Sequence, residues 1–435
     1  QAAAWHIVNF FFFQLGVYFL YRLSKRWMST EAALAASALF AWQPLLWGHA
    51  FINPKDPPFL TFFLASVCLG FEMVDKLVAE QQPKFSVVIL PAIVLGISTS
   101  IRVLGPLAGL LVFAYFIFAI NQNKNLRIPV SLWLHFLAYA LVAMLAMFLT
   151  WPYLWESPIA RFTDVLRFMS DNPTNLSVLF SGEIYRAGEL PRRYLPFMLT
   201  RTLTEPVWFL FITGVVIGFW KLFNEDPSQK ANKVFTATLT LFWFAIVVAY
   251  ALLRKPAMYD GFRHFQFIVP PVFVFAGFAF EFLFRRVREV STTYRTWLHA
   301  VITLAILTPG LLGIAQLHPY EYTYYNSFIG GTAGAFRYYE TDFWLTCYKE
   351  AVEELNNIES HTDLFVHREA YIADYYANEN INVREQRDAI DQVQSGDYIL
   401  VNTRTNEDRR ILKNVEPIVQ IQRGNAIFCI IKRVP

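Results

Sequence analysis

The chain has 435 residues, of which 55% are hydrophobic, 17% aromatic and only 16% charged. A soluble globular domain carries about 25% charged residues, so this composition indicates a protein whose main solvent is a membrane. The formal net charge of +3 is scattered along the chain, and no basic run alternates with stacking aromatics, which excludes a nucleic-acid-binding protein.

The three cysteines, Cys68, Cys347 and Cys429, have neither CxxC spacing nor histidine neighbours suited to zinc. A metal site built on cysteine is therefore not expected. Cys68 falls in an apolar run, where a thiol is a small buried hydrophobe. Cys347 and Cys429 lie in the charged C-terminal part and could pair, a question that the sequence leaves open.

Spanning a bilayer takes about 20 mainly apolar residues, because every backbone polar group must be satisfied within the helix. Ten windows of the sequence qualify, two of them short. The sequence therefore predicts an α-helical polytopic membrane protein with about ten transmembrane helices. The windows are 4–23, 31–51, 58–76, 85–101, 104–120, 130–151, 206–223, 234–253, 264–284 and 297–316.

The distribution of Lys and Arg over the short loops predicts the orientation, because cytoplasmic loops carry the excess. Alternate loops hold 14 basic residues and the intervening ones five, so we expect residue 1 and the C-terminal region to face outward, from an inner or plasma membrane. The 14 are Arg22, Lys25, Arg26, Lys76, Lys84, Lys124, Arg127, Lys221, Lys230, Lys233, Arg285, Arg286, Arg288 and Arg295, and the five are Lys55, Arg102, Arg254, Lys255 and Arg263.

Two outward regions are too long for simple connections. Residues 151–205 mix aromatics, prolines and arginines, as amphipathic helices at a membrane interface do. After residue 316 the composition becomes charged, and short β-rich runs at 363–367, 397–402 and 426–432 are separated by helical stretches. We therefore expect a multi-span domain over 1–316, with its large loop at 151–205, and a small extracytoplasmic α/β domain over 317–435.

Ionisable groups at membrane depth are costly, so those between helices are candidates for function. In NPKDPPF, Asp56 could accept a proton from a hydroxyl or hold a divalent metal, Mg or Mn, while Lys55 could neutralise a phosphate. A polar hairpin with a helix cap explains the same residues. Arg102 interrupts an apolar stretch, and its guanidinium group could bind a phosphate. An arginine whose side chain only extends to the membrane interface would give the same sequence pattern.

Two further outward clusters carry polar groups. The loop 254–264 holds Tyr259, Asp260, Arg263 and His264, which could grip a phosphosugar, whereas attraction to lipid phosphates alone would need only the cations. After the last window, aromatics and carboxylates follow each other as they do in sugar sites and also in membrane-interface belts. The members of this second cluster are His318, Glu321, Tyr324, Glu340 and Asp342.

The sequence has no GxSxG, Walker, HExxH or GxGxxG signature in a supporting context. It does have NPKDPPF, SIRVLGP, WPYLWESP, LPRRYLPF, YDGFRHFQFIVPP, HPYEYTYYN and RYYETDFW, in this order. The series resembles C-type (GT-C) glycosyltransferases of the protein O-mannosyltransferase and aminoarabinose transferase group, which depend on a phospholipid carrier. The resemblance covers nearly the whole chain.

This resemblance implies an inverting transfer of a sugar from a polyprenyl-phosphate donor to an acceptor at the outer membrane face. Asp56 would be the catalytic or metal-binding acid, and Lys55, Arg102, Arg263 and His264 would bind the donor phosphate. Asp260, Tyr259 and the cluster after the last window would line the sugar or acceptor site. The acceptor, whether lipid, glycan or protein, and the sugar are not specified.

One departure from the family pattern is that its main catalytic acid follows the first span, whereas this chain resembles the family from the second span onward. We therefore expect an upstream segment. Two other classes of protein remain open: a multi-pass transporter or flippase, and a non-catalytic sugar-binding subunit. Transporters place their polar groups near the membrane midplane, whereas here they gather at one face.

Overall fold

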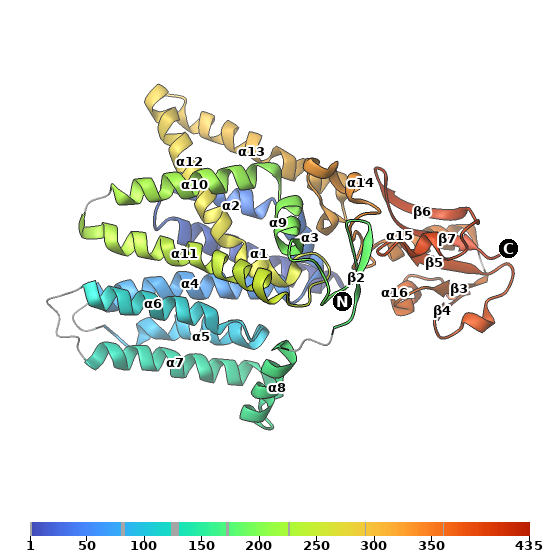
Figure 1. Cartoon of the computed structure of the whole chain (residues 1–435), viewed down its shortest axis with the longest axis horizontal. Coiled ribbons are helices and arrows are strands. Elements are labelled where there is room, and N and C mark those ends of the chain that lie inside the picture. Colours follow the sequence, from blue (N-terminus) through green and yellow to red (C-terminus); the bar gives the residue numbers. More distant parts are fainter. Residues whose placement is uncertain are drawn as a thin grey trace. The chain divides into compact units, whose positions relative to one another are not determined.

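The computed structural model describes residues 2–79, 83–122, 130–170, 174–224, 227–291, 293–359 and 361–435. Lys124 and Arg127 lie outside these residues. The chain divides into two units, one built of helices and one that contains a β-sheet (Figure 1). Unit 1 comprises 1–173, 205–256 and 263–311, and unit 2 comprises 174–204, 257–262 and 312–435.

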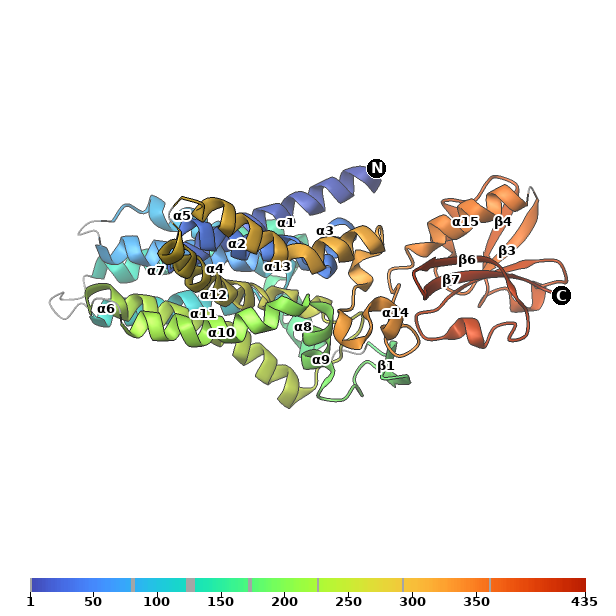
Figure 2. The same cartoon turned by 90° about the horizontal axis from the view of Figure 1, so that it is seen from above.

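Unit 1 is built of helices that run alongside one another (Figures 1 and 2). The second apolar window, 31–51, forms two helices because Pro44 lacks a backbone N–H and starts a new helix after Gln43. The helices are α1 (Ala2–Ser24), α2 (Thr30–Ala41), α3 (Pro44–Ile52), α4 (Asp56–Ala79), α5 (Ser86–Ile101), α6 (Pro106–Gln122), α7 (Val130–Thr150), α8 (Pro158–Ser170), α10 (Glu205–Phe223), α11 (Pro227–Arg254), α12 (Pro270–Val290) and α13 (Arg295–Leu317), with 3-10 turns η1 (Pro152–Leu154) and η2 (Arg263–Ile268).

Within the described residues, six helices are long and apolar enough to cross a membrane: Ala4–Ser24, Asp56–Ala79, Val130–Thr150, Glu205–Phe223, Lys230–Arg254 and Arg295–Leu317. Of the apolar stretch in α7, only 22% is buried, so most of its hydrophobic side chains face outward. Such a surface is stable in lipid and not in water. The protein is therefore an integral, multi-pass membrane protein, as the composition predicts.

Helix α4 lies at the centre of unit 1, with 89% of its apolar stretch buried, and it packs against α1, α5 and α6. Close helix pairs elsewhere depend on glycine: a Cβ at Gly214 of α10 would overlap the Phe275 carbonyl of α12. The first residue of this central helix is Asp56.

Unit 2 contains a five-stranded sheet in the order β4-β3-β5-β7-β6. Strands β3 (Thr362–Val366), β4 (Ile381–Glu385) and β5 (Tyr398–Asn402) are parallel, whereas β7 (Ala426–Arg433) runs antiparallel to β5 and to β6 (Pro417–Arg423). The expected α/β fold is thus present. The edge strands β4 and β6 escape the sequence prediction because both mix exposed polar residues with apolar ones.

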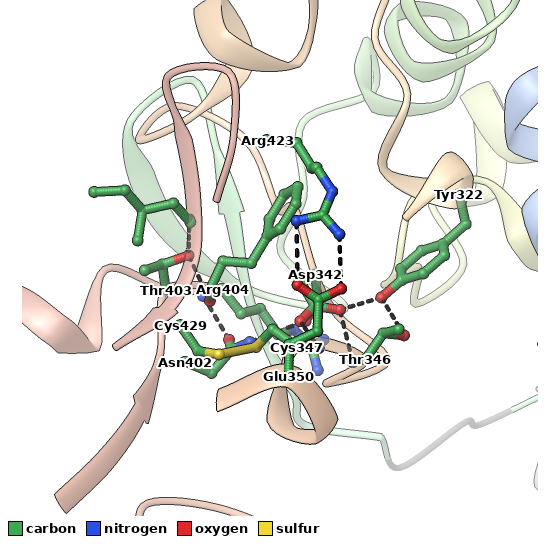
Figure 3. The surroundings of a disulfide bond; sticks show 12 residues. Tyr322, Asp342, Thr346, Cys347, Glu350, Asn402, Thr403, Arg404, Arg423 and Cys429 are labelled. Atoms are coloured by element: carbon green, nitrogen blue, oxygen red, sulfur yellow. Dashed lines mark hydrogen bonds and ion pairs between the residues drawn. A yellow bond between two sulfur atoms is a disulfide. The ribbon is translucent and has the colours of Figure 1, made fainter. Parts of the chain in front are cut away.

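Helix α15 (Cys347–Ile358) packs against β6 and β7, and the short α16 (Ala370–Asp374) against β3 and β4. A disulfide joins Cys347, the first residue of α15, to Cys429 on β7 (Figure 3). Both sulfurs belong to the hydrophobic core of unit 2, which also contains Tyr348 and Phe428. The pairing that the sequence left open is therefore formed.

The long region 151–205 contributes to both units. Its first part forms η1 and α8 of unit 1, and its second part forms the hairpin β1 (Ser177–Phe180) and β2 (Glu183–Arg186) and helix α9 (Tyr194–Thr202) of unit 2. The Asn326 side chain donates to the carbonyl oxygens of Thr200 and Leu203 at 2.8 and 2.9 Å, which fixes the end of α9.

Candidate functional site: a carboxylate between two arginines

The NPKDPP turn places Asp56 through the side chain of Asn53, which follows α3. The Asn53 Oδ1 accepts hydrogen bonds from the backbone N–H groups of Lys55 and Asp56 at 3.1 and 3.0 Å. Its Nδ2 donates to the Asp56 Oδ2 at 2.7 Å. Pro57 and Pro58 suit the first turn of α4, where no backbone N–H is needed. The turn therefore fixes both the backbone and the carboxylate of Asp56, which is 2% exposed.

Two arginines from distant parts of the chain meet this carboxylate. Arg102 ends α5, and its Nη2 donates to the Asp56 Oδ1. Arg263 begins η2, and its Nη1 lies 3.8 Å from the Asp56 Oδ2. The side chains of Arg102 and Arg263 are 11% and 16% exposed, so the cluster is largely removed from solvent.

The cluster carries more positive than negative charge. Lys55, Arg102 and Arg263 supply three cations against the one carboxylate of Asp56. Partial desolvation of its ammonium lowers the pKa of Lys55, and the nearby Arg102 lowers it further. The Nε of Arg102 is buried without a hydrogen-bond partner among the described residues. An excess of cations with a spare donor suits an anion such as a phosphate.

Two histidines complete the surroundings of Asp56. His264, which follows Arg263, interacts electrostatically with the carboxylate, and its binding to a donor phosphate stays a prediction. His49 of α3 is 1% exposed, and its Nδ1 lies 3.4 Å from the Asn53 Nδ2. Sequence inspection missed His49, although its spacing of four residues before Asn53 places both on one helical face.

An apolar cavity of about 690 Å³ lies between α5, α6, α7 and α8 in unit 1. Its wall includes Thr99 and Pro106, which flank Arg102 in the chain by three and four residues. The rest of the wall is mostly aliphatic and aromatic and includes Leu95, Phe113 and Phe136. The cavity therefore reaches the end of α5 at which Arg102 binds Asp56.

A divalent metal does not fit the donors around Asp56. The described residues contain no group of three His, Cys, Asp or Glu side chains placed to share an ion. Asp56 is the one carboxylate in a set of three cations, and its oxygens already accept from Arg102 and Asn53.

In unit 2, Asp260 and Glu340 bind one arginine that sequence inspection missed. The Nη2 of Arg404 lies 2.6 Å from the Asp260 Oδ1, and its Nε lies 2.9 Å from the Glu340 Oε1. The Asp260 N–H donates to the Glu340 Oε2 at 3.2 Å. Burial raises the pKa of Glu340, against the opposing effect of Arg404. Arg404 follows β5 and is an isolated cation in the sequence, without a pattern that indicates its partners.

Asp342 lies at the start of α15, where its carboxylate accepts from the backbone N–H groups of Thr346 and Cys347 at 2.9 and 3.0 Å (Figure 3). The Tyr322 hydroxyl also donates to it. Burial raises the pKa of Asp342 to about 6. This carboxylate thus stabilises the helix next to the disulfide.

The remaining predicted sugar-site residues also lie in unit 2. The Nδ1 of His318 lies 2.7 Å from the Glu321 Oε1, with the histidine 76% exposed and the glutamate 5%. Tyr324 is buried and Tyr259 is half-buried. His318 and Glu321 thus form a local contact, and the role of all four residues in sugar binding stays a prediction.

No protein-family model matches the chain, and no curated protein matches it. It is similar to the solved structure of ArnT from Cupriavidus metallidurans in the apo state, with 12% identity, 98% of this chain and 83% of that chain covered, and a TM-score of 0.49. It is also similar to the structure of the same protein bound to undecaprenyl phosphate, with 12% identity and a TM-score of 0.47. That match covers 99% of this chain and 84% of that chain. A third similar structure is archaeal oligosaccharyltransferase AglB from Archaeoglobus fulgidus in complex with an inhibitory peptide and a dolichol-phosphate, with 11% identity and a TM-score of 0.46. That match covers 92% of this chain and 58% of that chain.

Proposed function

We propose that this protein is a membrane glycosyltransferase that takes a sugar from a polyprenyl-phosphate donor. The observation that carries the proposal is the arginine-clamped Asp56 in the same unit as an apolar cavity, whose wall includes Thr99 and Pro106, close to Arg102 in the chain. A polyprenyl-phosphate sugar has the same two parts, a phosphate and a long hydrocarbon chain. The acceptor is a hydroxyl group of a lipid, glycan or protein.

The phosphate is bound by the cations around Asp56. Arg102 and Arg263 present planar N–H groups that match phosphate oxygens, and Lys55 adds a point charge at the exposed edge of the cluster. Asp56 holds the two guanidinium groups in place before the donor arrives. Because the arginines are fixed in advance, little of the binding energy is lost in ordering them.

The hydrocarbon chain is bound in the cavity between α5 and α8. Its wall is almost entirely apolar, and it includes Thr99 and Pro106, three residues before and four residues after Arg102 in the chain. An isoprenoid chain bound there would be shielded from water, which stabilises it by about 25 cal/mol for each Å² of apolar surface buried. This arrangement favours a lipid-linked sugar over a soluble nucleotide sugar as donor.

In the transfer step, the acceptor oxygen forms a bond to the anomeric carbon while the bond from that carbon to the phosphate oxygen breaks. The electron pair leaves with the phosphate, whose added negative charge is stabilised by Arg102, Arg263 and Lys55. The proton of the acceptor hydroxyl goes to a carboxylate, a role for which we propose Asp56. Asp56 would have to loosen its contact with Arg102 as it accepts the proton.

We place the reaction on the outer face of the membrane. The Cys347–Cys429 disulfide supports an extracytoplasmic unit 2, because disulfides persist in oxidising compartments and not in the cytosol. The predicted loop charges also put the Asp56 end of α4 outward.

The direct test is transfer from a radiolabelled polyprenyl-phosphate hexose by the purified protein with any native upstream segment included, compared with its Arg102→Lys and Asp56→Asn variants. We expect both variants to lose transfer while remaining folded. If the protein bound donors with several different sugars but cleaved none of them, the enzyme proposal would be wrong, and a sugar-binding subunit would be indicated. Movement of uncleaved donor across liposome membranes would identify a flippase.

A further inference from the structure

A second charged cluster lies at the other end of the unit 1 helices. Asp75 follows Asp56 by 19 residues in α4, which is about 28 Å along a helix axis. Around this end, Arg22 of α1 pairs with Glu72 of α4, and Arg26, in the turn after α1, pairs with Asp75. Lys25 lies in the same turn and lines the pocket at this end. The site described above does not use these residues.

Most of these charges are paired. The Arg22 guanidinium donates to Glu72 at 2.7 and 2.5 Å, and that of Arg26 donates to Asp75 at 2.6 and 2.9 Å. The Lys25 Nζ donates to the Thr30 hydroxyl at 2.7 Å, so its described hydrogen-bond partner is neutral. Three cations against two carboxylates leave one positive charge in excess, and Lys25 carries it.

An open cavity of about 300 Å³ lies at this cluster, lined by Arg22, Leu23, Lys25, Arg26, Cys68 and Glu72. A cavity with one excess cation and several N–H donors is complementary to a phosphate diester, which carries one negative charge. Basic pockets between transmembrane helices on the cytoplasmic side bind anionic lipid head groups in this way.

The outer face of α1 indicates where such a phosphate comes from. Ile7, Phe11 and Tyr18 are 69%, 64% and 50% exposed and follow one another at helical spacing. Arg22 continues that spacing by four further residues, and Lys25 follows in the turn directly after the helix. One face of α1 therefore presents apolar side chains to acyl chains and ends in the charged cavity.

We propose that this cavity binds the phosphate head group of an anionic phospholipid from the predicted cytoplasmic leaflet, with its acyl chains along the Ile7, Phe11 and Tyr18 face. The lipid is distinct from the sugar donor, since it binds at the opposite end of α4. Free inorganic phosphate has the same charged group but cannot use the apolar face.

The test is titration of the purified full chain with dioleoylphosphatidylglycerol, followed by native mass spectrometry, with dioleoylphosphatidylcholine and inorganic phosphate in parallel. Lys25→Gln should weaken phosphatidylglycerol binding by about fivefold, since one Lys near a membrane surface contributes about 1 kcal/mol. Lys76→Gln is the matched control, because Lys76 is also exposed near the end of α4 but does not line the cavity. Glu72→Gln should strengthen binding by releasing Arg22.

Equal losses in the two lysine variants, or none in either, would overturn the proposal. So would equally tight binding of phosphatidylcholine. Competition by inorganic phosphate at matched concentration would show that the cavity takes a soluble anion, and would reject the lipid.

Discussion

Replacing Asp56 by Asn removes one charge from the arginine cluster and little else. The amide keeps the size of the carboxylate, and Asn53 still holds the turn. Arg102 and Arg263, at 11% and 16% exposure, both lose their ion pair with this carboxylate. Breaking a buried ion pair from one side costs about 3–5 kcal/mol, so the variant should unfold at lower temperature.

Transfer should fall more than stability alone explains. Loss of a positioned base removes a factor of about 10² to 10⁴ in rate, or roughly 2.7–5.4 kcal/mol in the barrier. Single-turnover kinetics with labelled donor would separate binding from chemistry. A lower transfer rate at unchanged donor affinity indicates a base, whereas loss of affinity as well indicates that Asp56 mainly orients the arginines.

Glu281→Gln provides the control for damage to the fold. Glu281 of α12 is also a shielded carboxylate, 15% exposed, which accepts from the Ser29 N–H at 2.8 Å and lies 3.4 Å from Arg288. This variant should lose stability and keep transfer. If Asp56→Asn retained more than about a tenth of the transfer rate, or if both variants lost transfer equally, the role proposed for Asp56 would be refuted.

Three further predictions address the cavity and unit 2. Because Ala140 lines the cavity, Ala140→Phe should raise the KM for a long-chain donor and leave the KM for a short-chain donor unchanged. The control Leu137→Phe, at an exposed position that faces lipid, should change neither KM. Replacing Cys347 and Cys429 by Ala should lower the unfolding free energy of unit 2 by about 4.5 kcal/mol, the chain-entropy value for their separation of 82 residues, as measured by denaturant unfolding under matched conditions. Burial raises the Asp342 pKa from 3.8 to about 6, so the folded state holds the proton more tightly and stability should fall as pH rises from about 4 to 6, by roughly 3 kcal/mol. In thermal unfolding, the Asp342→Asn variant should not show this fall in stability with pH. If both proteins had the same pH dependence of stability, the prediction would be wrong.

The order of elements follows from local sequence patterns. Long apolar windows predict helices because a backbone in lipid must satisfy its own hydrogen bonds. The break at Gln43–Pro44 was readable in principle, since proline cannot continue a helix, but the continuous apolar composition of 31–51 hid it. The edge strands β4 and β6 were missed because half-exposed strands resemble polar loops.

The sequence by itself determined that this is a multi-pass membrane protein with a C-terminal α/β region, and it singled out Asp56, Arg102 and Arg263. Hydropathy and charge carry that information residue by residue. Only the tertiary structure decided that these three side chains meet, and that Asp260 and Glu340 share Arg404. Partners separated by 46 to 207 residues cannot be assigned from spacing, because helix packing and chain turns bring them together.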